Sequence, residues 1–339
     1  MTKAFEESLS FFKDKISDCI KSKKSISITT HIDCDGLTSG SIIAKALIRE
    51  GARCTLRTSK EFSKNVVESF KTDSRDFHIV TDLGGGFGKD LNQTLGDNWV
   101  ILDHHQISEE EKDNQNIINS WKYGIDGGSE ICAGGMAYFA AMALDEKNSD
   151  LSEIAVVSAL GDRQDQGERK SFTGKNFEIA NTAKELGLVE IDLDLLLVGR
   201  ETRPLAEALA FTSQPFIEGL TWNKETCLTI LKSSGIELKE EGRWRVPAEL
   251  NEEEKKLVIE SITKFSSDKN TTEVMSELIG YTYTFPREDK RSFLRDGREY
   301  STMLNSCGRI NRSGVGMAIC MGDRNKVLTE GEWILTDYR

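Results

Sequence analysis

The stretch Ser25-Ile26-Ser27-Ile28-Thr29-Thr30-His31-Ile32-Asp33-Cys34-Asp35-Gly36 decides the fold of this chain. Residues 24–30 have the pattern of a strand, residues 39–50 have helical character, and residues 51–57 are again strand-like. A change from strand to helix to strand is the pattern of a βαβ unit. It predicts an α/β fold built on a parallel sheet, with the acidic turn at residues 31–36 between the first strand and the helix.

Further short apolar segments come later in the chain, and each is followed by an acidic residue. Residues 77–81 lead to Asp82, residues 99–102 lead to Asp103, and residues 153–160 lead to Gly161-Asp162. In open α/β sheets, ligands bind in the crevice beyond the carboxyl ends of the strands. We therefore expect these segments to be neighbouring strands whose acidic side chains meet in one crevice.

The second part of the chain is organised differently. The first domain is predicted to span residues 1–195, because the alternation of strands and acidic residues stops near residue 195. Helical patterns at residues 204–212, 226–231 and 252–265 predict a helical connector or insertion over residues 196–270. Residues 271–339 are expected to form a smaller C-terminal α/β domain, with strand-like segments at residues 317–321 and 333–336.

Composition excludes several classes of protein. The 339 residues include 44 Lys and Arg against 56 Asp and Glu, a net charge of −12, which is opposite to that of a protein that coats DNA passively. A polyanionic substrate would therefore have to meet a local basic surface or metal ions. The 7 cysteines form no C-x-x-C pair, which favours a reducing cytoplasm, and no apolar run predicts a signal peptide or a membrane span.

Three of the 4 histidines, His31, His104 and His105, lie close to aspartates at the predicted strand ends. Asp33 and Asp35 are two residues apart in a turn, so their carboxylates can diverge toward two neighbouring cations. Carboxylate and imidazole ligands without a thiolate favour Mn²⁺ or Mg²⁺, and the histidines favour Mn²⁺ of the two. Two such ions are typical of metal-assisted phosphodiester hydrolysis.

These motifs, in this order, resemble those of the DHH phosphoesterase superfamily. The motifs are His31-x-Asp33-x-Asp35-Gly36, Asp82, Asp103-His104-His105 and Gly161-Asp162. The tail, with Cys307-Gly308-Arg309 and Ser313-Gly314-Val315-Gly316, is similar to the C-terminal substrate-binding domain of archaeal RecJ-like nucleases, including GINS-associated nucleases. The stretch at residues 312–316 departs from the wider superfamily, because it lacks the histidine of a G-G-G-H run.

The resemblance implies a role for each of these residues. One metal ion would be held by His31, Asp33 and Asp82, and the other by Asp35, Asp82, His104 and Asp162, with Asp82 bridging the two. Asp35, Asp103 and His105 would act in catalysis, where His105 contacts the scissile phosphate and Asp103 supports the histidines. Substrate would be bound by His105, Arg309, Gly314 and Gly316, with the Arg309 guanidinium gripping a phosphate.

The resemblance also implies a function. We expect an Mn²⁺-dependent exonuclease that hydrolyses single-stranded DNA or RNA to mononucleotides in replication or repair, associated with the GINS complex. A phosphodiesterase of short oligonucleotides or cyclic dinucleotides is one alternative, and a non-catalytic replication scaffold that binds GINS is another. Strand polarity and the preference for DNA or RNA stay open, since no motif encodes them.

Overall fold

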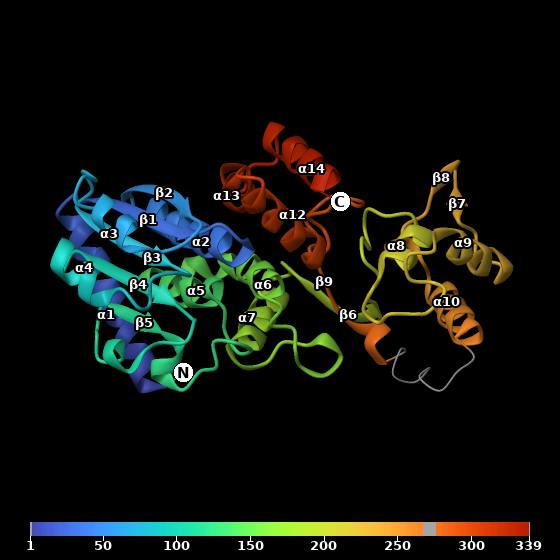
Figure 1. Cartoon of the computed structure of the whole chain (residues 1–339), viewed down its shortest axis with the longest axis horizontal. Helices are drawn as coiled ribbons and strands as arrows, with labels where there is room; N and C mark the ends of the chain where they lie inside the picture. Colours follow the sequence, from blue (N-terminus) through green and yellow to red (C-terminus); the bar gives the residue numbers. More distant parts are fainter. Residues whose placement is uncertain (1, 267–275, 339) are drawn as a thin grey trace. The chain divides into compact units, whose positions relative to one another are not determined.

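The predicted βαβ pattern forms a five-stranded parallel sheet in the computed structural model, which describes residues 2–266 and 276–338 (Figure 1). The strands lie in the order β2-β1-β3-β4-β5, and every neighbouring pair is parallel. Their bounds are β1 Ser25–His31, β2 Arg53–Ser59, β3 Phe77–Thr81, β4 Trp99–Asp103 and β5 Ile117–Asn119. The predicted α/β class with a parallel sheet is therefore confirmed.

This strand order creates a topological switch point between β1 and β3. The chain leaves β1 toward β2 on one side, and it proceeds from β3 to β4 and β5 on the other. Loops that leave neighbouring strands in opposite directions open a crevice at their carboxyl ends, where ligands bind in such sheets. The ends of β1 and β3 are His31 and Thr81, so the acidic turns that follow them meet at this crevice.

Helices cover both faces of the sheet. On one face, Val67 and Phe70 beside α3 and Leu91 of α4 pack with Val80, Ile101 and other apolar residues of the strands. Helix α2 contacts β1, and α5 contacts β4. The helices up to residue 186 are α1 Lys3–Lys21, α2 Cys34–Arg49, α3 Lys64–Ser69, α4 Gly88–Leu95, α5 Ala133–Leu144, α6 Ser152–Gly161 and α7 Gly174–Glu185.

Three segments predicted as strands are helices. Residues 153–160 lie in α6, residues 317–321 lie in α13 (Ser313–Met321), and residues 333–336 lie in α14 (Lys326–Tyr338). Short apolar runs of this kind have no clear period, so a buried helix and a buried strand read alike in sequence. Consequently Asp162 follows the end of a helix and not of a strand, and the described residues after 284 contribute helices and no further strand of the sheets.

The described chain divides into two compact units. One comprises Met1–Gln166, Phe172–Leu186 and Ser301–Arg339, and the other comprises Gly167–Ser171 and Gly187–Tyr300. The boundary expected at residues 270 and 271 lies outside the described residues. The division places α13, α14 and the later part of α12 (Gly297–Arg309) in the unit that holds the parallel sheet.

The second unit has its own core. Strands β6 (Glu190–Leu195) and β9 (Ile279–Thr284) pair antiparallel, and β7 (Lys239–Glu240) pairs with β8 (Arg243–Trp244) in a short hairpin. The helices predicted for the connector are present as α8 Leu205–Phe211, α9 Lys224–Ser233 and α10 Glu252–Phe265. No helix among residues 2–266 and 276–338 is long and apolar enough to cross a bilayer.

Candidate metal centre

The residues predicted as metal ligands gather at the switch point of the sheet. Asp82 follows β3 in the left-handed backbone region, with φ of 62°, which an aspartate tolerates better than most residues. This conformation turns the chain sharply at the strand end, and the Asp82 side chain lies buried between β1 and the turn after β4. Three groups of His and Asp ligand atoms form here, and two of them share Asp82.

The first group contains His31, Asp33 and Asp82. The Nδ1 atom of His31 lies 2.9 Å from Asp33 Oδ2 and 3.6 Å from Asp82 Oδ2. Asp33 is also the N-cap of α2, because its Oδ1 accepts a hydrogen bond from the Gly36 N–H at 2.9 Å. The cap fixes one carboxylate oxygen on the helix and leaves the other beside the imidazole.

The second group contains Asp35, His104 and Asp162. The Nε2 atom of His104 lies 3.2 Å from Asp35 Oδ2 and 3.3 Å from Asp82 Oδ1, and its Nδ1 lies 3.7 Å from Asp162 Oδ2. Asp82 thus reaches both groups, with Oδ2 toward His31 and Oδ1 toward His104. The structure therefore places all the implied ligands close together, with Asp82 in the first group and in contact with the second through His104.

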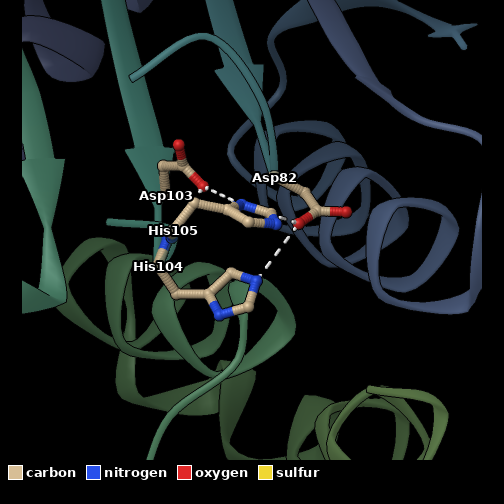
Figure 2. A group of neighbouring side chains, drawn as sticks. All are labelled: Asp82, Asp103, His104 and His105. Carbon is tan, nitrogen blue, oxygen red and sulfur yellow. Dashed lines mark hydrogen bonds and ion pairs between the residues drawn. The ribbon is translucent and has the colours of Figure 1, made fainter. Parts of the chain in front are cut away.

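Asp103 and His105 form a pair beside these groups (Figure 2). Asp103 is buried at the end of β4, and its Oδ1 lies 2.8 Å from His105 Nδ1 and accepts the His104 N–H at 2.8 Å. The side chain of His105 is 61% exposed. Because Asp103 accepts a hydrogen bond from the Nδ1–H of His105, the Nε2 edge of His105 is left available to a ligand.

The cluster concentrates negative charge in a buried place. Burial and the neighbouring Asp35 raise the pKa of Asp82 to about 7, and the same two causes raise that of Asp162 to about 6. Hydrogen bonds to Asp33 and Asp82 raise the pKa of His31 to about 10. Burial alone would raise the pKa of Asp35, but hydrogen bonds from His104, Ser158 and the Gly134 N–H hold it at about 2. The site therefore favours bound positive charge.

The donor set fits a divalent cation. The Oδ2 atom of Asp82 is buried and has no hydrogen-bond partner among the described residues. The Nδ1 atom of His104 lies 2.6 Å from the Gly127 carbonyl, which can only accept, so Nδ1 carries a proton. Burial would lower the pKa of His104, but the Asp35 and Asp82 carboxylates raise it, so without a cation Nε2 also holds a proton that it shares with these two neighbours. A divalent cation at this place would replace that proton and neutralise the same carboxylates. These oxygen and imidazole ligands suit Mn²⁺ and also Mg²⁺.

Several residues that hold these ligands in place were not predicted from the sequence. The buried amide of Gln164 donates to Asp162 Oδ2 at 2.7 Å and to the Gly127 carbonyl at 2.8 Å, so one side chain supports both Asp162 and the acceptor of His104. Asn176 donates in turn to Gln164 Oε1 at 2.5 Å. In the sequence, the one sign of this network is a Gln two residues after the presumed ligand Asp162, and its burial is known only from the structure.

The carboxylate of Asp35 is held in a similar way. Its Oδ2 and Oδ1 accept the backbone N–H groups of Ala133 and Gly134 at 2.8 and 2.9 Å, at the N-terminus of α5. The Ser158 hydroxyl of α6 also donates to Oδ1. A helix N-terminus stabilises a carboxylate, so Asp35 is fixed before any cation binds.

Of the predicted substrate-binding residues, His105 belongs to the pair described above, Arg309 ends α12, and Gly314 and Gly316 lie on α13. A Cβ on Gly308 would lie 1.8 Å from the Ile32 carbonyl, so this glycine lets α12 pack against the turn that carries Asp33. Arg309 is the next residue and is exposed. Gly314 is also exposed, whereas Gly316 is buried against Leu37 of α2 and is explained by close helix packing.

Asn305 of α12 was not predicted and also contacts the acidic turn. Its Oδ1 accepts the Cys34 N–H at 2.9 Å, between the two motif aspartates. The C-terminal helices therefore buttress the metal-ligand turn.

Family models match two parts of the chain. Residues 25–161 match the N-terminal domain of the DHH family, and residues 197–279 match the DHH-CID domain. The chain is also 29% identical over 340 residues to an uncharacterized protein of Methanocaldococcus jannaschii, covering 96% of this chain and 72% of that one.

The fold is similar to those of solved structures at low sequence identity. Exonuclease RecJ bound to manganese superposes with a TM-score of 0.55 at 13% identity, covering 97% of this chain and 66% of that one. RecJ of Thermus thermophilus in complex with Mn²⁺ gives a TM-score of 0.53 at 13% identity, and the chain covers 38% of its length. CDC45 from Entamoeba histolytica gives 0.67 at 17% identity, covering 98% of this chain and 71% of that one. The chain therefore has a RecJ-like fold and contains an N-terminal domain of the DHH family followed by a DHH-CID domain.

Proposed function

We propose that this protein is a divalent-cation-dependent exonuclease that acts on single-stranded nucleic acid. The observation that carries the proposal is the pair of ligand groups, His31 with Asp33 and His104 with Asp35, joined through the buried carboxylate of Asp82. Two cations held at such groups would supply the charge that activates water and stabilises the leaving oxygen of a phosphodiester. The DHH-family domain and the RecJ-like fold support this class of chemistry.

The residues of the chain divide the remaining work. The Asp103 hydrogen bond raises the pKa of His105, so its exposed Nε2 edge would be protonated and able to donate to a phosphate oxygen. Arg309 is exposed one residue after Gly308, which packs on the acidic turn, and its guanidinium would bind a backbone phosphate. Gln164 would keep His104 and Asp162 in their ligand geometry.

We propose Mn²⁺ as the preferred ion, with Mg²⁺ as a weaker substitute, because two imidazoles enter the two groups. The product would be mononucleotides released from one end of a DNA or RNA strand. A role in replication or repair, with GINS as a partner, would follow from the resemblance to archaeal RecJ-like nucleases. The CDC45 fold similarity favours a second candidate, a replication scaffold without catalysis.

Digestion of end-labelled single strands distinguishes the two candidates. Matched DNA and RNA oligonucleotides, labelled at either end, are incubated with Mn²⁺, with Mg²⁺ or with a chelator. We expect Mn²⁺-dependent mononucleotide release that is lost in Asp162→Asn and kept in Asp113→Asn, an exposed carboxylate outside the three groups. Metal binding without cleavage of any strand would contradict the nuclease and support the scaffold.

A further inference from the structure

A second polar cavity lies at the β2 edge of the sheet and shares no residue with the metal centre. Its volume is about 390 Å³. The residues that line it are Ser27, Thr55, Arg57, Ser69, Thr72, Asp73 and Arg75. We propose that this cavity, called the β2 pocket below, binds the phosphate group of a small phosphate monoester or of inorganic phosphate.

The strand register explains how these side chains come together. Ser27 of β1 pairs with Thr55 of β2, and Thr29 pairs with Arg57 two residues further on. Paired residues of parallel strands point to the same face, and side chains two apart share that face. Residues 69–75, at the end of α3 and in the turn after it, supply the other wall. Strand β2 is at the edge of the sheet and pairs with β1, so the sheet side of the pocket is formed by these two strands.

Two hydrogen-bond donors in the pocket are buried without a partner. Ser27 is 1% exposed, and its hydroxyl makes no hydrogen bond among the described residues. Arg57 is half-buried, and its buried Nη2 likewise makes no hydrogen bond there. The other nitrogens of Arg57 are engaged, with Nε donating to Thr29 Oγ1 at 3.0 Å and Nη1 lying 3.2 Å from Asp73 Oδ2. The guanidinium also lies over the Phe70 ring, with Cζ 5.0 Å from the ring centre, and Nη2 is the nitrogen left without an acceptor.

The charge of the pocket points to an anion. Arg75 donates from Nε to Thr55 Oγ1 at 3.3 Å, and in the described part of the chain no carboxylate pairs with its guanidinium. The single carboxylate of the pocket, Asp73, is occupied by Arg57 and by the Arg75 N–H at 3.1 Å. Two arginines and one aspartate leave a net charge of +1 in a chain whose net charge is −12.

A tetrahedral oxyanion matches these donors best. Arginine binds phosphate through two parallel N–H donors, and a serine hydroxyl completes the set as a single donor. A volume of about 390 Å³ exceeds what a phosphate ion needs and falls in the range of sites for small organic ligands. The pocket therefore has room for a phosphate carried on a body of the size of a mononucleotide.

Titration of the full-length protein tests the proposal. The protein is kept in chelator, so that phosphate bound through cations at the metal centre does not contribute. Inorganic phosphate, adenosine monophosphate and adenosine are each added at constant ionic strength, and heat of binding is measured. We expect saturable binding of both phosphate compounds and none of adenosine. A higher affinity for the monophosphate would identify an organic phosphate as the ligand, and equal affinities would identify the phosphate group alone.

Three variants locate the binding. Arg75→Gln should weaken binding by about tenfold or more, because it removes a charged donor to phosphate. Ser27→Ala should weaken binding while leaving the thermal stability of the free protein unchanged or higher, because it removes a buried hydroxyl without a partner. Lys60→Gln removes an exposed positive charge outside the pocket and should bind as the parent protein does. The proposal is overturned by equal binding of adenosine, by no saturable binding, or by Arg75→Gln and Ser27→Ala binding like the parent protein.

Discussion

Replacing Asp82 by Asn should stabilise the metal-free protein and abolish its stabilisation by Mn²⁺. Asn keeps the size of the side chain and, like Asp, tolerates the left-handed backbone at φ of 62°. The substitution therefore changes the charge of a buried group with little change in packing. Asp82 is 2% exposed, and in chelator no cation compensates the repulsion between its carboxylate and that of Asp35.

The magnitude follows from the pKa of Asp82. Burial first, and then the charge of Asp35, raise this pKa from 3.8 to about 7 in the folded chain. The unfolded chain ionises first, so stability falls as the pH rises from 3.8 to about 7 and is constant above that. At 1.36 kcal/mol per pKa unit, the ionised carboxylate costs about 4 kcal/mol above pH 7.

The contacts of Asp82 with His104 and His31, at 3.3 and 3.6 Å, lower its pKa, so the value of about 7 already includes them. The expected gain of Asp82→Asn at about pH 8 is therefore at most about 4 kcal/mol. This corresponds to a rise of up to about 8–16 °C in the melting temperature, at about 2–4 °C per kcal/mol for a unit of this size.

Thermal unfolding at about pH 8 and about pH 4, in chelator and in excess Mn²⁺, measures these effects. At the lower pH the gain should vanish, because Asp82 is then protonated in the folded parent protein. Mn²⁺ at about 100 times its dissociation constant should stabilise the parent by about 2.7 kcal/mol and the variant not at all. The control is Asp33→Asn. Because Asp33 is a ligand of the first group, this variant should also lose the stabilisation by Mn²⁺. Because its side chain is 45% exposed, it should not gain stability in chelator. A lower melting temperature of Asp82→Asn in chelator at the higher pH, or a retained Mn²⁺ effect, would refute the reasoning.

Other perturbations test separate parts of the structure. Gly308→Ala should destabilise the fold by about 1–3 kcal/mol in thermal unfolding, since the new Cβ would lie 1.8 Å from the Ile32 carbonyl; an unchanged melting temperature would contradict this packing. Asp103→Asn should reduce Mn²⁺-dependent cleavage by about 10- to 100-fold, because a neutral amide does not raise the pKa of His105 as the carboxylate does, and parent-like rates would exclude that role. Burial would raise the pKa of Asp194, but its ion pairs with Arg200 and Lys255 outweigh burial and lower this pKa. The ionised Asp194 therefore stabilises the fold above pH 3.8, and this stabilisation is lost as the pH falls through the lower pKa of the folded state. Acid titration of Asp194→Asn should therefore show a weaker loss of stability below pH 3.8 than the parent shows, and identical acid curves would rule this out.

The sheet and its acidic ends were predictable because local pattern and topology agree. Strands β3 and β4 are five-residue apolar segments that end at a carboxylate or just before one, and in a parallel sheet their carboxyl ends must meet at one edge. The predicted helices α9 and α10 have amphipathic spacing that identifies a helix without knowledge of its neighbours. In each case the signal lies within about ten consecutive residues.

Segments without a period were not assigned correctly. Helices α6 and α13 are almost uniformly apolar or small, so no face is distinguished, and both were predicted as strands. The resemblance implies a substrate role for Gly316 of α13, and its burial against Leu37 gives this glycine a packing role as well. Only the packing of these segments decides between helix and strand.

By itself, the sequence determined the class of the fold and the meeting of the acidic turns after β1, β3 and β4 at one edge of the sheet, since both depend on strand periodicity. Asp162 was expected there at a strand end, but it follows helix α6. Tertiary structure decided how those side chains are held. Gln164 donates to Asp162, its neighbour in the sequence, and also to the carbonyl of Gly127, which holds His104 and is distant in the sequence. Asp35 is fixed by the N-terminus of α5, nearly one hundred residues later in the chain. The β2 pocket likewise joins residues 27, 55 and 75, because strand register and the turn after α3 place them together. Hydrogen bonds between distant segments leave no period in a sequence, so only the folded chain reveals them.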